Sequence, residues 1–407
     1  MGINAIVGQS GGPTSVINAS LAGVFTACQK RGARTVYGMR YGVQGLLQEK
    51  LVNLSAQFDS PMKLELLKRT PSSFLGSCRY KLPDFRENPT IYETLFALLK
   101  KYDIGYFFYI GGNDSMDTIC KLSDYAAYIG SDIRFAGVPK TIDNDLIITD
   151  HTPGYGSAAK YIGVCVKELV RDSTIYDLKS VTVLEIMGRN AGWLTAAAAL
   201  ARDEDCEGAA MICLPETVFD PEAFVARVAE LQKTAPSIVV AVSEGIRVSD
   251  GRYVCELADS ALQEDAFGHK YLGGTASYLA ALAASRLGVK SRAVELSTLQ
   301  RCAAHMVSRT DVLEAGQVGG AAVSAAYEGA SGVMVSLKRV NNDPYQCITE
   351  LVDIHDVANY EKKVPRHWID EENLTMRQEF FDYVLPLIDA EVSPMYVRGL
   401  PQHLILR

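Results

Sequence analysis

The sequence predicts an α/β protein with parallel sheets, arranged as two lobes. Short, continuously apolar segments alternate with longer amphipathic segments, and glycine or proline often separates them. Continuous apolar segments are typical of strands covered on both faces, as in parallel sheets, and strand–helix alternation is typical of the doubly wound class. The length of 407 residues is typical of two domains rather than one.

The expected elements follow one another from the start of the chain. Residues 3–7 form the first strand, and the Gly11-Gly12-Pro13 turn leads into a helix that ends at residue 31, before Gly32. The further strands are expected at 35–39, 106–110, 135–138, 181–186, 210–214 and 238–242. The further helices are expected near 91–101, 115–129, 155–171, 191–201, 221–233, 274–287, 311–328 and 371–387.

Composition excludes several classes of function. The 40 basic and 48 acidic residues give a net charge of −8, whereas nucleic-acid binding needs clustered Lys and Arg. Nine cysteines occur singly without a Cys-x-x-Cys pair, which predicts neither a zinc ribbon nor a disulfide framework. The N-terminus does not read as a signal peptide, and no apolar segment approaches the ~20 residues of a membrane span. We expect a cytoplasmic protein without a nucleic-acid or membrane partner.

Two glycine-rich loops follow predicted strands, where ligands bind in parallel α/β sheets. Residues 10–14, SGGPT, and residues 111–115, GGNDS, each open a helix. Backbone N–H groups at such a turn, together with the helix dipole, favour an oxyanion. A steric role for the glycines, and helix capping by Ser115, are the alternatives.

Two further loops carry charged side chains. Residues 139–145, PKTIDND, hold one lysine and two aspartates. In an extended loop Asp143 and Asp145 point to the same side, so that one could accept a proton while the other helps to hold a divalent metal. Arg189 follows the strand at 181–186 and is placed to bind a phosphate bidentately. A solvated turn and a helix-capping arginine are the alternatives, and the chain has neither a Walker A motif nor Gly-x-Gly-x-x-Gly after the first strand.

Taken in order, these motifs resemble the phosphofructokinase family across nearly the whole chain. The matching segments are SGGPTSVINAS at 10–20, LGSCR at 75–79, GGNDS, PKTIDND, MGRNAGW at 187–193, LPE at 214–216, SEG at 243–245 and SRA…LQR at 291–301. The resemblance implies a two-lobed, three-layer, Rossmann-like phosphofructokinase fold. It places residues 1–154 plus about 300–350 in a phosphoryl-donor lobe, and about 155–299 plus 351–407 in a sugar-phosphate lobe.

Within the family, the chain resembles the pyrophosphate-dependent branch. Asp114 and Lys140 stand where ATP-dependent members usually have glycine. A carboxylate ~4 Å from a nucleotide α-phosphate costs roughly 4 kcal/mol at an effective dielectric of 20. The lysine would attract pyrophosphate, and attraction for one donor with repulsion of another gives specificity.

The implied reaction is reversible, Mg²⁺-assisted transfer of a phosphoryl group from pyrophosphate to the 1-hydroxyl of fructose 6-phosphate, giving fructose 1,6-bisphosphate and phosphate. Asp143 matches the general base, an aspartate as in protein kinases. Thr141 would position the transferring group, and Gly11 and Gly12 would bind the donor with Lys140.

The resemblance also implies a sugar site and a metal site. The sugar-site positions are Thr141, Asp143, Met187, Gly188, Arg189, Glu216, Arg292, Thr298 and Arg301. Thr298 stands where histidine is common, and Asn113, a metal position with Asp145, stands where aspartate is common. Subunit association, as a homodimer or homotetramer, is expected.

Three alternatives remain open. An ATP-dependent phosphofructokinase is disfavoured by Asp114 and Lys140. A catalytically silent sugar-phosphate sensor on the same fold would not need Asp143. A lipid or NAD kinase would not need Arg292 and Arg301.

Overall fold

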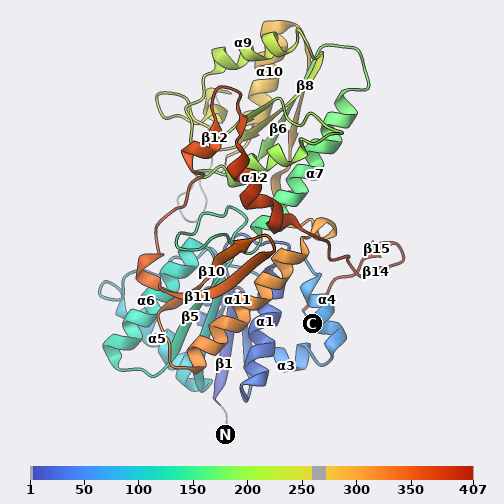
Figure 1. Ribbon diagram of the computed structural model, residues 1–407. Coiled ribbons are helices and arrows are strands. Elements are labelled where there is room, and N and C mark those ends of the chain that lie inside the picture. Colours follow the sequence, from blue (N-terminus) through green and yellow to red (C-terminus); the bar gives the residue numbers. More distant parts are fainter. Residues whose placement is uncertain (1–2, 259–271, 407) are drawn as a thin grey trace.

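The computed structural model describes residues 3–258 and 272–406, which form two units, each built around one sheet (Figure 1). The larger sheet has the strand order β11-β10-β5-β4-β1-β2-β3. Its strands are β1 (Asn4–Gln9), β2 (Val36–Met39), β3 (Leu51–Asn53), β4 (Ile104–Gly111), β5 (Arg134–Pro139), β10 (Val333–Asn342) and β11 (Tyr345–Asp353). The smaller sheet, β7-β8-β6-β9, consists of β6 (Ser180–Ile186), β7 (Met211–Cys213), β8 (Ser237–Ser243) and β9 (Lys290–Glu295).

The smaller sheet is parallel throughout, as predicted, whereas the larger sheet is parallel only in its centre. Its two edge strands, β3 and β11, pair antiparallel with their neighbours. Partly buried and exposed side chains alternate along much of β11, as expected for a strand with one solvated face. Neither edge strand was predicted, because neither is continuously apolar.

Helices cover both faces of each sheet, so that each unit has three layers (Figure 1). In β1, Ala5 and Val7 contact the side of α1 and α11, while Ile6 contacts the side of α5 and α6. The helices of the larger unit are α1 (Ile17–Lys30), α2 (Gly42–Leu47), α3 (Leu54–Gln57), α4 (Pro61–Lys68), α5 (Pro89–Lys101), α6 (Asn113–Ile129) and α11 (Arg309–Tyr327). Those of the smaller unit are α7 (Tyr155–Ser173), α8 (Trp193–Ala196), α9 (Pro221–Leu231), α10 (Thr275–Leu287) and α12 (Gln378–Val384).

Helices α1 and α11 cross at close range because both carry glycine at the crossing. A Cβ atom on Gly23 would lie 2.2 Å from the backbone oxygen of Gly316, and one on Gly319 would lie 2.3 Å from that of Ser20. Backbones this close leave no room for any side chain. The crossing ties residues near the start of the chain to residues beyond 300.

The chain passes repeatedly between the two units. It leaves the larger unit after β5, returns with α11, β10 and β11, contributes α12 to the smaller unit, and ends beside α4, where the Leu404 N–H donates to Thr70 Oγ1 at 2.9 Å. Strand β11 runs in the larger sheet to Asp353. The division of the chain into lobes at about residues 155, 300 and 350 stays a prediction.

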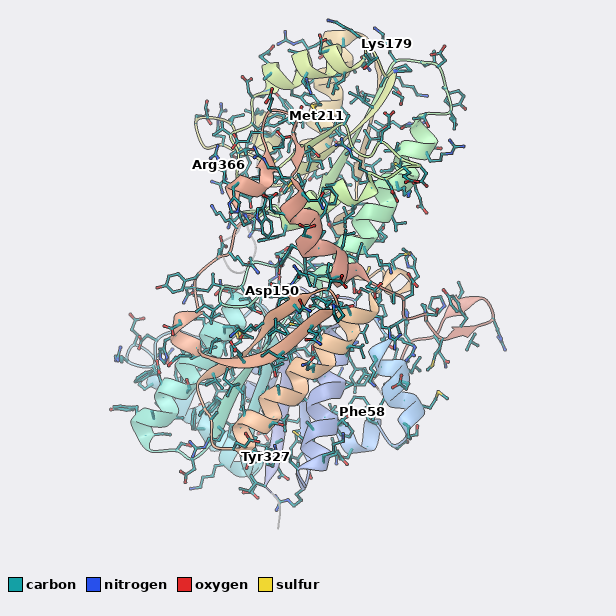
Figure 2. The ribbon with its side chains drawn as sticks, in the orientation of Figure 1. Phe58, Asp150, Lys179, Met211, Tyr327 and Arg366 are labelled. Carbon is teal, nitrogen blue, oxygen red and sulfur yellow. The ribbon has the colours of Figure 1, made fainter. Side chains whose placement is uncertain are left out.

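Buried polar groups join the segment after β5 to α11 of the larger unit and to α12 of the smaller one, where Figure 2 labels Asp150. The ring of His151 lies between Asp150 Oδ1, 2.8 Å from Nδ1, and Glu314 Oε2, 2.6 Å from Nε2. Burial alone would lower the pKa of His151, but the two carboxylates raise it to about 9. A charged network therefore holds this junction. No helix in the described part of the chain is both long and apolar enough to cross a membrane.

Candidate active site

A cavity of about 850 Å³ lies where the carboxyl ends of strands from both sheets meet. Loops after β1, β4 and β5 line one side, and loops after β6, β8 and β9 line the other. Crevices at the carboxyl ends of parallel strands are where ligands bind in this class of sheet. Most of the predicted site residues line it: Gly11, Gly12, Asn113, Asp114, Lys140, Thr141, Asp143, Asp145, Met187, Gly188, Arg189, Thr298 and Arg301.

Lys140 joins the loop after β5 to the glycine turn after β1. Its side chain is 2% exposed, and Nζ donates to the backbone oxygen of Gly12 at 2.7 Å. Gly11 has φ +74°, and a Cβ atom there would lie 3.3 Å from Lys140 Nζ. The N–H of Gly11 donates to the backbone oxygen of Cys78 at 3.3 Å, so it is engaged rather than open to a donor phosphate as expected.

Burial controls the charges around Lys140. It lowers the pKa of Lys140 to about 8, against the opposing attraction of Asp143 and Asp145. It raises the pKa of Asp143, which Lys140 and Arg189 counteract. It also raises the pKa of Asp145 to about 7, and the neighbouring Asp143 adds to that shift. The cavity thus holds two carboxylates poorly solvated by water beside two cations.

The loop that carries these aspartates is not extended, contrary to the expectation. Asn144, between them, has a left-handed backbone with φ +55°. Its buried amide explains this conformation, because Nδ2 donates to the Tyr383 hydroxyl at 2.8 Å and Oδ1 accepts from the Thr152 N–H at 3.1 Å. Asp143 and Asp145 nevertheless both line the cavity.

Asn113, expected as a metal ligand, forms hydrogen bonds to residues 359 and 360, which are distant in sequence. Its Oδ1 accepts from the N–H of Asn359 at 2.6 Å, and its Nδ2 donates to the backbone oxygen of Tyr360 at 2.5 Å. Both polar atoms of the amide are therefore used. Residues 359–361 line the cavity as a result, and no pattern in the sequence pointed to them because they follow no predicted strand.

Backbone contacts shape the loop after β6. Gly188 has φ +141°, its oxygen accepts from Ser243 Oγ, and its N–H donates to Glu244 Oε1 at 3.4 Å. The Met187 N–H donates to Gln300 Oε1 at 3.3 Å. These contacts hold Arg189 at the cavity, on the same side as Thr298 and Arg301 of the short 3₁₀ helix η3 (Ser297–Arg301).

Two predicted sugar-site residues do not line the cavity. Glu216 Oε1 accepts from the N–H groups of Gly192 at 2.8 Å and Val364 at 3.0 Å, so it supports the loop after β6 from behind. Arg292 is exposed on edge strand β9, with Nη1 3.7 Å from Asp172 Oδ2. Neither side chain is among the residues that line the cavity of its own chain, and their roles at a sugar site stay predictions.

The cavity also contains charged residues that were not singled out. They are Arg79, Lys81, Glu185, Glu244, Glu295 and Glu361. Burial raises the pKa of Glu244 to about 7, and Asp143 adds to the shift. The sequence did point to Glu244 and Arg79, because they lie in the family-like segments SEG and LGSCR. Glu216 and Glu244 both follow strands of the smaller sheet, and only the fold shows which one faces the cavity.

Two sheets whose parallel strands meet at their carboxyl ends, with glycine turns, buried carboxylates and cations there, define an α/β phosphotransferase. The family model for phosphofructokinase matches residues 4–296. The chain belongs to the phosphofructokinase family.

Individual relatives match over nearly the full length. The chain is 43% identical to the pyrophosphate–fructose 6-phosphate 1-phosphotransferase of Methylococcus capsulatus, over 99% of this chain and 96% of the relative. It is 42% identical to the protein of the same name from Halomonas elongata, over 98% and 95%. The crystal structure of a pyrophosphate-dependent phosphofructokinase from Nitrosospira multiformis superposes with a TM-score of 0.88 at 38% identity, covering 99% of this chain and 96% of that chain.

Proposed function

We propose that this chain catalyses reversible phosphoryl transfer from pyrophosphate to the 1-hydroxyl of fructose 6-phosphate, giving fructose 1,6-bisphosphate and phosphate. The position of Lys140 carries the assignment of the donor. Its buried ammonium lies against the glycine turn after β1, with Asp114 on the same cavity. The Lys140 ammonium attracts pyrophosphate, a short inorganic donor. The Asp114 carboxylate repels the phosphate of a nucleotide. The names of the relatives that match over nearly their full length agree with this choice.

Asp143 acts as general base in this proposal. It lies in the loop after β5, where Lys140 and Arg189 are close enough to influence its pKa. It accepts the proton of the sugar hydroxyl as the oxygen attacks phosphorus in line. Thr141 Oγ1 accepts from the Asp143 N–H at 3.1 Å and so fixes the base relative to the transferring group. Arg189 and Arg301 hold the sugar phosphate from the opposite side.

The residues present fit a divalent cation. Asp143 and Asp145 place two carboxylates in one buried region, where their mutual repulsion helps to raise the pKa of Asp145. Mg²⁺ would be held mainly by Asp145 with water and donor oxygens, because the Asn113 amide is already engaged. When bound, Mg²⁺ supplies neutralisation of the phosphate charge.

Subunit association and location complete the proposal. Arg292 is exposed and outside the cavity of its own chain, which supports a homodimer or homotetramer in which it reaches another copy's sugar phosphate. Sedimentation would give the subunit number.

The nine cysteines are free thiols, which supports a reducing cytoplasm.

The deciding experiment supplies fructose 6-phosphate and Mg²⁺ with either pyrophosphate or ATP, and measures fructose 1,6-bisphosphate. Product with pyrophosphate alone supports the proposal. Product with ATP alone overturns the donor assignment at Asp114 and Lys140. No product with either donor would favour a sugar-phosphate sensor.

A further inference from the structure

A mixed cluster of metal-ligating side chains lies on the larger unit, outside the cavity. Cys120 and Asp124 belong to α6, and His355 belongs to the short 3₁₀ helix η5 (Ile354–Asp356). One ligand atom from each residue lies within 4.8 Å of the others. The closest pair is His355 Nε2 and Asp124 Oδ1, 2.9 Å apart, and Cys120 Sγ lies 4.0 Å from Asp124 Oδ2.

The backbone explains why these atoms converge. Cys120 and Asp124 are four residues apart on α6, so their side chains share one helix face. Strand β11 ends at Asp353, and Asp353 Oδ1 accepts from the N–H of His355 at 2.9 Å, which starts η5 and directs His355 toward α6. Cys120 and Asp124 are partly buried and His355 is exposed, so that the cluster is open to solvent on one side.

The orientation of the imidazole, which forms ion pairs with two aspartates, also suits a metal ligand. Asp353 Oδ1 lies 2.7 Å from His355 Nδ1, which leaves Nε2 directed at the Asp124 carboxylate. Metal-binding histidines typically donate one ring N–H to such a carboxylate, which fixes the tautomer and leaves the other nitrogen for the ion. The ion pairs of His355 with Asp124 and Asp353 do not involve the sulfur of Cys120. A metal ion would use this sulfur as a ligand.

The ligand set points to a particular ion. Thiolate, imidazole and carboxylate together suit Zn²⁺, which prefers four ligands in a tetrahedron. Mg²⁺ prefers six oxygen ligands and is poorly matched to sulfur and nitrogen. We propose that Cys120, Asp124 and His355 bind one Zn²⁺ ion per chain, with water as the fourth ligand.

The site would fasten the same segment that Asn113 holds. Asn113 and Cys120 lie on the same helix, and the segment that begins at His355 continues to residues 359–361 at the cavity. Zn²⁺ would therefore be a second attachment of residues 355–361 to α6. This inference does not depend on the proposed reaction, because its test measures binding alone.

Co²⁺ is the probe, since a Co²⁺–thiolate bond gives a charge-transfer absorption that oxygen ligands do not. The full chain is treated with a chelator, dialysed, and titrated with Co²⁺ in excess Mg²⁺, and Zn²⁺ is then added to displace the Co²⁺. We expect one Co²⁺ per chain with the thiolate absorption. C120S should lose that absorption, and H355Q should weaken binding at least about tenfold.

Matched controls locate the site. C206S and H367Q alter a partly buried cysteine and an exposed histidine outside the cluster, and both should bind Co²⁺ as the unmodified chain does. D145N should also leave the absorption unchanged, which separates this site from the cavity. Circular dichroism establishes that each variant is folded.

Three results would overturn the proposal. One is the absence of saturable Co²⁺ and Zn²⁺ binding to the unmodified chain. Another is folded C120S and H355Q variants that bind both ions as the unmodified chain does. Loss of binding in C206S but not in C120S would likewise assign the ion to another place.

Discussion

Lys140 Nζ and the backbone oxygen of Gly12 are 2.7 Å apart, although 128 positions separate the two residues. This hydrogen bond brings the only lysine of the loop after β5 onto the glycine turn after β1. Because the ammonium is buried, it is positioned before any ligand arrives, and its interaction with an anion is weakly screened.

Replacing Asp114 and Lys140 together by glycine should exchange the donor preference. Loss of a charge-assisted contact is worth about 1.5–3 kcal/mol, so that kcat/KM for pyrophosphate should fall roughly ten- to hundredfold. Removing the carboxylate should allow measurable use of ATP. Steady-state kinetics with each donor tests both effects, with K338A, on the exposed side of β10, as the control. A double variant that keeps its pyrophosphate rate and ignores ATP would contradict the donor assignment.

Asp143→Ala should remove the general base while leaving the sugar site intact. Turnover should fall by roughly 10²–10⁴, and the affinity for fructose 6-phosphate should stay within a few fold. Single-turnover kinetics and equilibrium binding measure the two separately. Retained turnover with a large loss of affinity would show that Asp143 binds the sugar rather than accepting its proton.

Asn113→Asp distinguishes a fastening residue from a metal ligand. Aspartate keeps the acceptor for the Asn359 N–H but loses the donor to the Tyr360 oxygen, so residues 359–361 should exchange their amide hydrogens faster. The apparent affinity for Mg²⁺ in the activity assay should not improve. A severalfold gain in Mg²⁺ affinity, without faster exchange, would instead make residue 113 a metal position.

The junction at His151 predicts a pH dependence of stability. The folded-state pKa of about 9 lies above the ordinary value of 6.5, so this histidine contributes fully below pH 6.5 and its contribution is lost as the pH rises toward 9. At about 1.4 kcal/mol per pH unit, the full contribution is about 3 kcal/mol. Urea unfolding of the unmodified chain and H151Q at pH 6.5 and 8.5 measures it. Parallel pH profiles for the two proteins would exclude it.

Gly23→Ala should destabilise the crossing of α1 and α11. The added methyl would lie 2.2 Å from the Gly316 oxygen, so the helices must separate, at about 1–3 kcal/mol. Gly320, also in α11, has no atom within 4 Å of an added Cβ, so G320A should be neutral or stabilising by up to about 1 kcal/mol. Thermal unfolding compares the two. Equal melting temperatures would mean that the crossing relaxes freely.

The central strands could be predicted because burial on both faces leaves a continuous apolar run, as in β6 and β8. Strand β9 could not, since its sequence, KSRAVE, is polar and its side chains are largely exposed at the sheet edge. The hairpin of β10 and β11 was missed for a related reason: the second half of β10 is mostly exposed, and β11 has one solvated face.

The candidate site divides in the same way. Lys140, Asp143 and Arg189 stand directly after predicted strands, and the sequence alone places such residues at one edge of a sheet. The engagement of the Asn113 amide and the burial of Glu216 against Gly192 and Val364 are contacts between distant segments. Local sequence patterns do not reveal such contacts. The fold was therefore needed to show that residues 359–361 line the cavity, and that Glu244 rather than Glu216 does so.

The order of strands in the larger sheet has a consequence for synthesis of the chain. Strand β10 pairs with β5 in the larger sheet. The ribosome synthesises all four strands of the smaller sheet after Pro139, the end of β5, and before Val333, the start of β10. Until then β5 presents an unpaired, apolar edge, the kind of surface that attracts other nascent chains. Pairing with β10 covers this edge, so association through β5 is open to other chains only until β10 has been made.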